Sequence, residues 1–100
     1  MKDTHGKYRP SLTYTSLIEE VSKVRMYGIS KYGDSEDWLT TEPLDHLNAA
    51  IRHIRAHING TFCDEDSDEL HLTHAVTNLM FEIERMKRLD SHVKQSSKNH

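Results

Sequence analysis

The chain has 100 residues, 35% of them hydrophobic, and a formal net charge of −3. This length allows one domain, residues 1–100, and its apolar share lies below the roughly 45–50% of a typical globular domain. The composition favours a thin core completed in a homo-oligomer. It argues against a binder of duplex nucleic acid, which would be basic, and against a membrane protein, which would need an apolar run of about 20 residues.

The first predicted helix runs from about Thr15 to Tyr32. Its apolar residues recur at i, i+4 and i+7, and a glycine continues the row: Leu17, Val21, Val24 and Gly28. Gly33 suits a left-handed cap at the end of this helix, because it has no Cβ. The polar stretch 34–41 predicts a loop, and it carries the only tryptophan, Trp38.

The second predicted helix begins at Pro43 and ends at Gly60. Its apolar residues have heptad spacing and predict one buried stripe: Leu44, Leu47, Ile51, Ile54 and Ile58. A second stripe shares the neighbouring face: His46, Ala50, His53 and His57. We expect His46 and His57 to form a solvated or partner-facing flank. His53 is the functional candidate, with a purely structural histidine as the alternative.

The third predicted helix runs from about Glu69 to Leu89. Its apolar face consists of Leu72, Val76, Leu79, Ile83 and Met86. The residues from Asp66 to Glu69 can cap this helix and place negative charge where its dipole favours it, but capping does not explain why Asp64, Glu65 and Asp66 crowd together. Carboxylates this close together also repel one another unless a cation or several donors offset them. On the helix, three polar side chains point the same way, at i, i+3 and i+7: His71, His74 and Asn78.

The remaining observations concern location and the two ends of the chain. The single cysteine, Cys63, allows no internal disulfide, and the first residues lack the apolar run of a signal peptide. We therefore expect a cytoplasmic protein. The polar composition of the ends predicts flexible segments at about 1–10 and 91–100.

Four segments together resemble a known family. They are Tyr27–Asp34 followed by Trp38, Arg52-His53 seven residues before Gly60, Asp64–Ser67, and His71–Asn78. In this order and spacing they resemble the phage-type dATP/dGTP diphosphohydrolase domain, which is similar to the all-α NTP pyrophosphatases. The resemblance covers roughly residues 10–84. It implies an all-α bundle of three main helices, encoded by a phage and acting in the host cytoplasm on the deoxynucleotide pool.

The activity that the resemblance implies is hydrolysis of purine deoxynucleoside triphosphates to monophosphate and pyrophosphate. The expected cofactor is Mg²⁺, with Mn²⁺, Fe²⁺ or Zn²⁺ as alternatives. The expected metal ligands are Glu20, Asp64, Asp66 and His74. The expected catalytic residues are His53, His71 and Asn78. The expected substrate-binding residues are Lys31, Arg52, Tyr32 and Trp38.

The sequence departs from the related families at several positions, and two other functions stay open. The related pyrophosphatases carry an EExxE pattern on the first helix, whereas here Lys23 stands where the last acid would be. Asp66 replaces a glutamate that is usual in the family. One alternative is a catalytically inactive helical protein that sequesters a nucleotide or inhibits a host factor. The other is an HD-like phosphohydrolase in which His53, His71, His74 and an aspartate bind Fe²⁺, Mn²⁺ or Zn²⁺.

Overall fold

A computed structural model describes residues 6–98 of the chain, and their side chains as far as Asp90. It contains three α-helices and two short 3₁₀-helices: η2 (Pro10–Leu12), α1 (Thr15–Tyr32), η3 (Asp37–Thr40), α2 (Pro43–Ile58) and α3 (His71–Lys98). Apart from one isolated bridge between Cys63 and Leu70, these residues form no β-structure. The predicted all-α fold with three main helices is therefore confirmed. None of the described helices is both long and apolar enough to cross a membrane.

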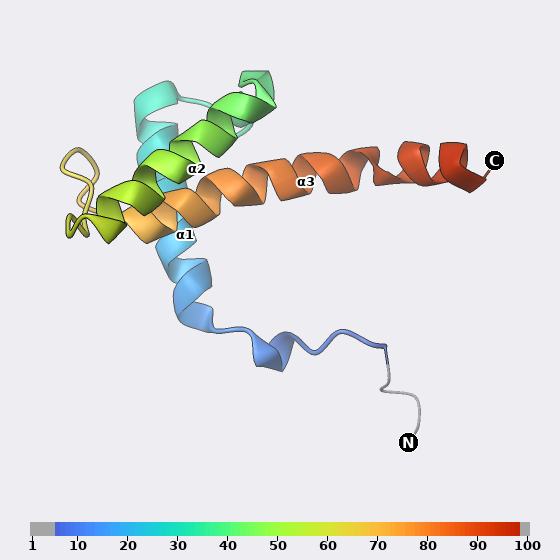
Figure 1. The fold of residues 1–100 in the computed structure, drawn as a ribbon, viewed down its shortest axis with the longest axis horizontal. Coiled ribbons are helices and arrows are strands. Elements are labelled where there is room, and N and C mark those ends of the chain that lie inside the picture. The colour runs from blue at the N-terminus through green and yellow to red at the C-terminus, as the bar shows by residue number, and fades with distance from the viewer. Residues whose placement is uncertain (1–5, 99–100) are drawn as a thin grey trace.

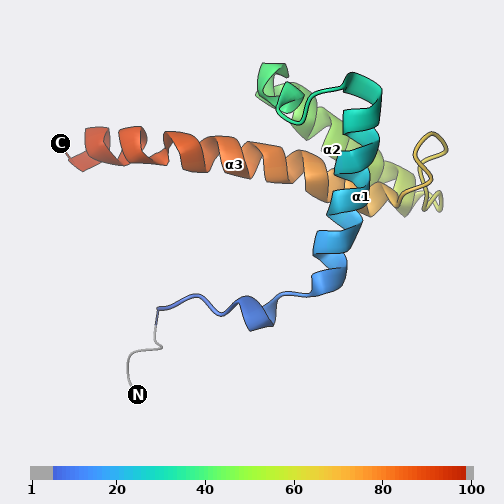
Figure 2. The ribbon, with the colours of Figure 1, turned by 180° about the vertical axis from the view of Figure 1, so that it is seen from behind.

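The third helix is the element on which the other two pack. α2 lies along the first half of α3, and α1 crosses α3 steeply near its N-terminal end (Figures 1 and 2). Figure 1 shows α2 nearer the viewer than α1, and Figure 2 shows the reverse. The C-terminal half of α3 extends beyond both helices. The loop that joins α2 to α3 lies at the opposite end of the molecule from this extension.

Two glycines end helices where the sequence predicts it. Gly33 has φ 84° and donates its N–H to the Ile29 carbonyl at 2.6 Å. Gly60 has φ 93° and donates to the His57 carbonyl at 3.0 Å. The third helix differs from the prediction, because it begins at His71 and continues to Lys98 instead of ending near Leu89. No glycine or proline follows Leu89 to end it.

The buried face of α2 is not the heptad stripe but the neighbouring face, which carries His46 and Ala50. The five apolar residues from Leu44 to Ile58 are 38–73% exposed, so the prediction of a buried stripe is wrong for the single chain. α2 instead buries Ala50 and His46, and the small Ala50 side chain allows a close approach of a neighbouring helix. The predicted solvated flank is therefore also wrong for His46, which is 6% exposed and bonded to Glu82. His57 is half-buried.

The apolar core within the described residues is small. Its buried members are Val24, Trp38, Ala50 and Ala75. The predicted apolar face of α3 is exposed to a similar degree as that of α2, from 37% at Val76 to 63% at Ile83. The thin core predicted from composition is thus present, and much of the apolar surface of α2 and α3 faces outward.

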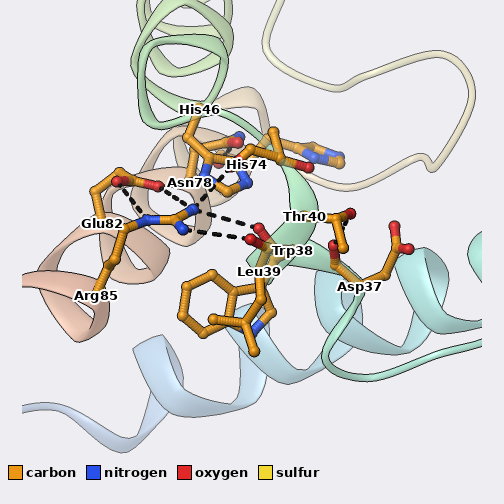
Figure 3. A network of polar contacts seen from close by, with 10 residues as sticks. Asp37, Trp38, Leu39, Thr40, His46, His74, Asn78, Glu82 and Arg85 are labelled. Atoms are coloured by element: carbon orange, nitrogen blue, oxygen red, sulfur yellow. Dashed lines mark hydrogen bonds and ion pairs between the residues drawn. The ribbon is translucent and has the colours of Figure 1, made fainter. Parts of the chain in front are cut away.

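A polar network fixes η3 against α3 (Figure 3). The guanidinium of Arg85 donates to the Thr41 carbonyl at 2.9 Å and to the Trp38 and Leu39 carbonyls at 3.4 Å. Glu82 accepts from Arg85 at 3.1 Å and pairs with His46. These bonds satisfy backbone carbonyls at the end of η3, and they hold Trp38 against the body of the protein.

Candidate functional site

The loop between α2 and α3 folds around the carboxylate of Asp64. One oxygen of this carboxylate accepts the backbone N–H groups of Asp66 at 2.9 Å and Ser67 at 3.0 Å. The Asp64 carbonyl accepts the N–H of Asp68, which has the unusual φ of 64°. The His71 N–H donates to the Phe62 carbonyl at 2.8 Å, which closes the loop at the start of α3. The carboxylate of Asp64 is therefore half-buried within the turn, whereas Glu65, Asp66 and Asp68 are exposed.

Asp64 meets two histidines from the two flanking helices. His53 of α2 and His71 of α3 approach with their Nδ1 atoms 2.7 Å apart. The side chains of His53, Asp64 and His71 each offer one ligand atom, and these atoms lie within 4.8 Å of one another. All three side chains are partly buried. The arrangement of two imidazoles and one carboxylate is typical of sites for divalent transition metals.

The protonation of these groups at neutral pH suits metal binding. Burial, together with the neighbouring His74 and His71, lowers the pKa of His53 to about 4, so its imidazole is neutral at pH 7. Burial by itself would raise the pKa of Asp64, but the hydrogen bonds from the Ser67 and Asp66 backbones outweigh it and lower the pKa. A neutral imidazole and an ionised carboxylate are the forms that bind metals.

His74 lies directly behind this cluster. Its ring stacks on that of His53, with centroids 4.6 Å apart and planes 13° from parallel. Its Nε2 is 2.6 Å from the Ser67 hydroxyl, which in turn lies 3.5 Å from the Asp64 carboxylate. His74 is buried, and burial lowers its pKa. Through these contacts His74, which the sequence suggests as a metal ligand, fixes the orientation of the His53 ring.

A pocket of about 600 Å³ opens beside the cluster. Nine of the eleven predicted site residues line it: Lys31, Tyr32, Trp38, Arg52, His53, Asp64, Asp66, His74 and Asn78. The pocket follows α3 from His74 to Phe81, a distance of about 10 Å at 1.5 Å per residue. Its length is therefore on the scale of a nucleotide rather than of a single phosphate group.

Two predicted site residues are not among those that line the pocket. His71 faces His53 at the edge of the cluster instead. Glu20 forms an ion pair with Lys23 at 2.9 Å on the surface of α1. The lysine that replaces the last acid of the EExxE pattern therefore pairs with one oxygen of the carboxylate that the sequence suggests as a metal ligand.

The predicted stacking residue Trp38 already has aromatic and cationic partners. Its ring is 7% exposed and stacks on Phe81, with centroids 5.1 Å apart and planes 8° from parallel. The guanidinium groups of Arg85 and Arg88 each lie 5.4 Å from its centre. Tyr32, by contrast, is 63% exposed, and the ammonium group of Lys31 lies 5.5 Å from the centre of its ring.

Sequence reasoning missed several residues that shape the pocket. Tyr27 and Phe81 line it, and the pair of Glu82 and Arg85 holds its wall at η3. Tyr27 belongs to a segment that carried the resemblance, so a signal for it existed. Glu82 and Arg85 gave none, because their partners His46 and Thr41 are separated from them by 36 and 44 residues.

Asn78 lines the pocket while its side-chain amide donates to the His74 carbonyl at 2.9 Å, one turn earlier on α3. This bond fixes the amide plane, so the group is presented to the pocket in one orientation. The same turn of α3 thus contributes His74 and Asn78 to the wall.

Comparison with known proteins agrees with the resemblance noted in the sequence. Residues 1–95 match the family described as dATP/dGTP diphosphohydrolase, N-terminal. No curated protein and no solved structure matches the chain significantly. The family match spans nearly the whole sequence, including every residue of the cluster and the pocket. The chain therefore belongs to the dATP/dGTP diphosphohydrolase N-terminal domain family.

Proposed function

We propose that this protein hydrolyses purine deoxynucleoside triphosphates between the α and β phosphates, with a divalent metal ion held by His53, Asp64 and His71. The observation that carries the proposal is the convergence of these three side chains beside a pocket of about 600 Å³. Membership of a family named for dATP/dGTP diphosphohydrolases supports the reaction class. The pocket and the cluster support each other, because either alone is common in proteins without such activity.

The donor set indicates which metals fit. Two imidazoles and one carboxylate favour Mn²⁺, Fe²⁺ or Zn²⁺, whereas Mg²⁺ prefers oxygen ligands. Metal–ligand bonds of about 2.0–2.2 Å place adjacent donors about 3–3.5 Å apart. The Nδ1 atoms of His53 and His71 are 2.7 Å apart, so a small rotation of the rings would provide this spacing. When bound, the ion would supply positive charge to phosphate oxygens and acidify a water molecule.

The protein's own cations and histidines complete the proposed mechanism. Arg52 is adjacent to His53, lines the pocket and is exposed, so its guanidinium can bind phosphate oxygens in bidentate fashion. Lys31 lines the same pocket from α1 and offers a second positive charge. We assign proton acceptance to His74, whose lowered pKa keeps it neutral at pH 7 beside the cluster.

The decisive experiment is a product assay with the purified protein. Each dNTP and NTP is incubated with Mg²⁺ or with Mn²⁺, and the products are separated by ion-exchange chromatography. The proposal expects dGTP and dATP to give the monophosphate and pyrophosphate in equal amounts. It also expects faster turnover with Mn²⁺ than with Mg²⁺, because of the histidine ligands. Intact nucleotides with every metal would contradict it and favour the binding protein suggested above.

A second candidate function is favoured by one observation. Three histidines and an aspartate lie together, as the HD-like alternative requires, since His74 stacks on His53 next to Asp64. An enzyme of that type would release the intact triphosphate from the nucleoside. The same assay separates the two reactions, because one yields pyrophosphate and the other tripolyphosphate.

A further inference from the structure

The glycine within α1 is not required by the backbone. Gly28 lies in the interior of the helix, and its φ is not positive, unlike that of Gly33 and Gly60. A glycine in a helix interior is less favourable than alanine, because it loses more conformational freedom on folding. The conformation of α1 therefore gives no reason for glycine at this position.

Packing gives no reason either. Apart from its chain neighbours and the backbone of α1 itself, a Cβ at Gly28 would meet no atom within 4 Å. The residue is only partly exposed, and it lines the pocket beside the metal-type cluster. The space that a side chain at Gly28 would enter is therefore pocket, not core.

The position of Gly28 relative to the cluster indicates which part of a bound ligand would lie against it. Val24, Gly28 and Lys31 follow one another at i, i+4 and i+7, and all three line the pocket from α1. The preceding residue, Tyr27, places its ring edge-on to His74, with centroids 6.3 Å apart. This turn of α1 is therefore next to the cluster, and a ligand that extends from the cluster along the pocket passes Gly28.

We infer that Gly28 is a specificity-determining residue: the nucleoside part of the substrate lies against the α1 backbone here, and the missing Cβ admits it. The inference rests on the proposed function, in which the phosphates bind at the cluster, Arg52 and Lys31. A purine presents a flat, uncharged face and the deoxyribose carries no charge, so both fit a bare helix surface better than a polyphosphate does. Gly28 thereby sets the width of the pocket for the nucleoside, while the cluster holds the phosphates.

The test compares Gly28→Ala and Gly28→Leu with the wild type in Mn²⁺, using dGTP as substrate and tripolyphosphate as a competitive inhibitor. One added methyl group should raise KM for dGTP about tenfold, and leucine should raise it further. The tripolyphosphate inhibition constant should stay within about twofold, because it has no nucleoside. Gly28→Ala should also raise Tm by about 4 °C, because alanine favours the helix.

A matched control is Ser30→Ala, which changes helix propensity on the same helix but lies outside the pocket. It should raise Tm slightly and leave KM unchanged. An unchanged KM in Gly28→Ala would overturn the inference. A parallel loss of dGTP and tripolyphosphate affinity would also overturn it, because the effect would then not belong to the nucleoside.

Failure of the proposed function can be recognised separately. If the wild type hydrolyses no nucleotide, calorimetry measures binding of dGTP with Mn²⁺ instead. About tenfold weaker binding to Gly28→Ala would then support the role of Gly28 without catalysis. Equal binding to both proteins would overturn that role, and no binding to the wild type would overturn both proposals.

Discussion

Asp64 has a structural role in the turn and an electrostatic role in the cluster, and substitution by asparagine separates the two. One of its oxygens accepts the Asp66 and Ser67 backbone N–H groups, and the ionised carboxylate offers charge to the cluster. Asp64→Asn keeps an oxygen acceptor for the turn but removes the charge. We expect Mn²⁺ affinity and turnover each to fall at least about tenfold, while Tm of the metal-free protein changes little. Calorimetric titration and the product assay measure both effects.

Glu65→Gln is the control for this prediction. Glu65 lies in the same turn, is exposed, and is not among the residues of the cluster. The Glu65→Gln substitution removes one negative charge from this loop, as Asp64→Asn does. Equal losses in Asp64→Asn and Glu65→Gln would show that the loop attracts the ion through its general charge and that Asp64 is not a specific ligand.

The histidine of the cluster on α3 gives a test that does not depend on activity. A metal that binds the folded protein raises its Tm by mass action, and removal by a chelator reverses this. Mn²⁺ should therefore stabilise the wild type and stabilise His71→Ala much less, because one of three ligand atoms is lost. Thermal melts with Mn²⁺ and with EDTA measure the difference. The same stabilisation in both proteins would remove His71 from the site.

At the scale of elements, Arg85 is the connection between η3 and α3. It donates to three carbonyls of residues 38–41, and its partner Glu82 is 13% exposed. Arg85→Ala should cost about 2 kcal/mol of unfolding free energy, because charged hydrogen bonds are lost and Glu82 is left with fewer donors. Arg85→Lys should recover only part of this, since one ammonium group cannot reproduce the planar fork. Urea unfolding measures the values.

Lys87→Ala is the matched control on the same helix. The Lys87 side chain is 69% exposed and its ammonium group lies 3.8 Å from Asp90, so its removal should change the unfolding free energy by less than about 1 kcal/mol. A cost for Arg85→Ala as small as that of Lys87→Ala would mean that η3 is held mainly by the stacking of Trp38 on Phe81.

The same network makes stability depend on pH. Burial by itself would raise the pKa of Glu82, but hydrogen bonds from Arg85 and His46 and their charges outweigh it, so its pKa lies below the ordinary value of 4.5. A carboxylate with a lowered folded-state pKa stabilises the protein above pH 4.5, and this contribution is lost as pH falls through the folded-state pKa.

The difference in unfolding free energy between wild type and Glu82→Gln should therefore be largest near pH 7 and shrink below about pH 4.5. Urea unfolding at a series of pH values measures this difference. A difference that stays constant from pH 7 to pH 3 would show that Glu82 contributes by shape and hydrogen bonding alone, without its charge.

At the scale of the whole molecule, the exposed apolar stripes of α2 and α3 lead us to predict a homo-oligomer. Both stripes have heptad spacing, which is typical of helices that pack on other helices, and both are at least 37% exposed. We expect the protein to sediment as a dimer or larger. Ile51→Glu, at the centre of the α2 stripe, should shift it towards the monomer, whereas Ser30→Glu on α1 should not.

A monomer at micromolar concentration would contradict this expectation, and analytical ultracentrifugation decides it. The reason for the expectation is the small core, since few of the described apolar residues are buried in the single chain. A domain of this size gains stability when such surface is covered.

The sequence determined the fold class and the helix boundaries that depend on local chemistry. Gly33 and Gly60 end their helices because glycine adopts a left-handed conformation without strain, and Pro43 begins α2 because its fixed φ suits the first turn. The spacing of His71, His74 and Asn78 placed them on neighbouring parts of α3. The acidic turn at Asp64 was also recognisable, because its residues are contiguous.

Only the tertiary structure decided which faces are buried and which side chains meet. Periodicity marks an apolar face but does not say whether it covers its own chain or another surface, so α2 buries Ala50 and His46 while Ile51 is exposed. Sequence spacing could not show that His53 and His71, on different helices, approach within 2.7 Å of each other. Such contacts depend on how the helices cross, and that geometry is set by packing between distant residues.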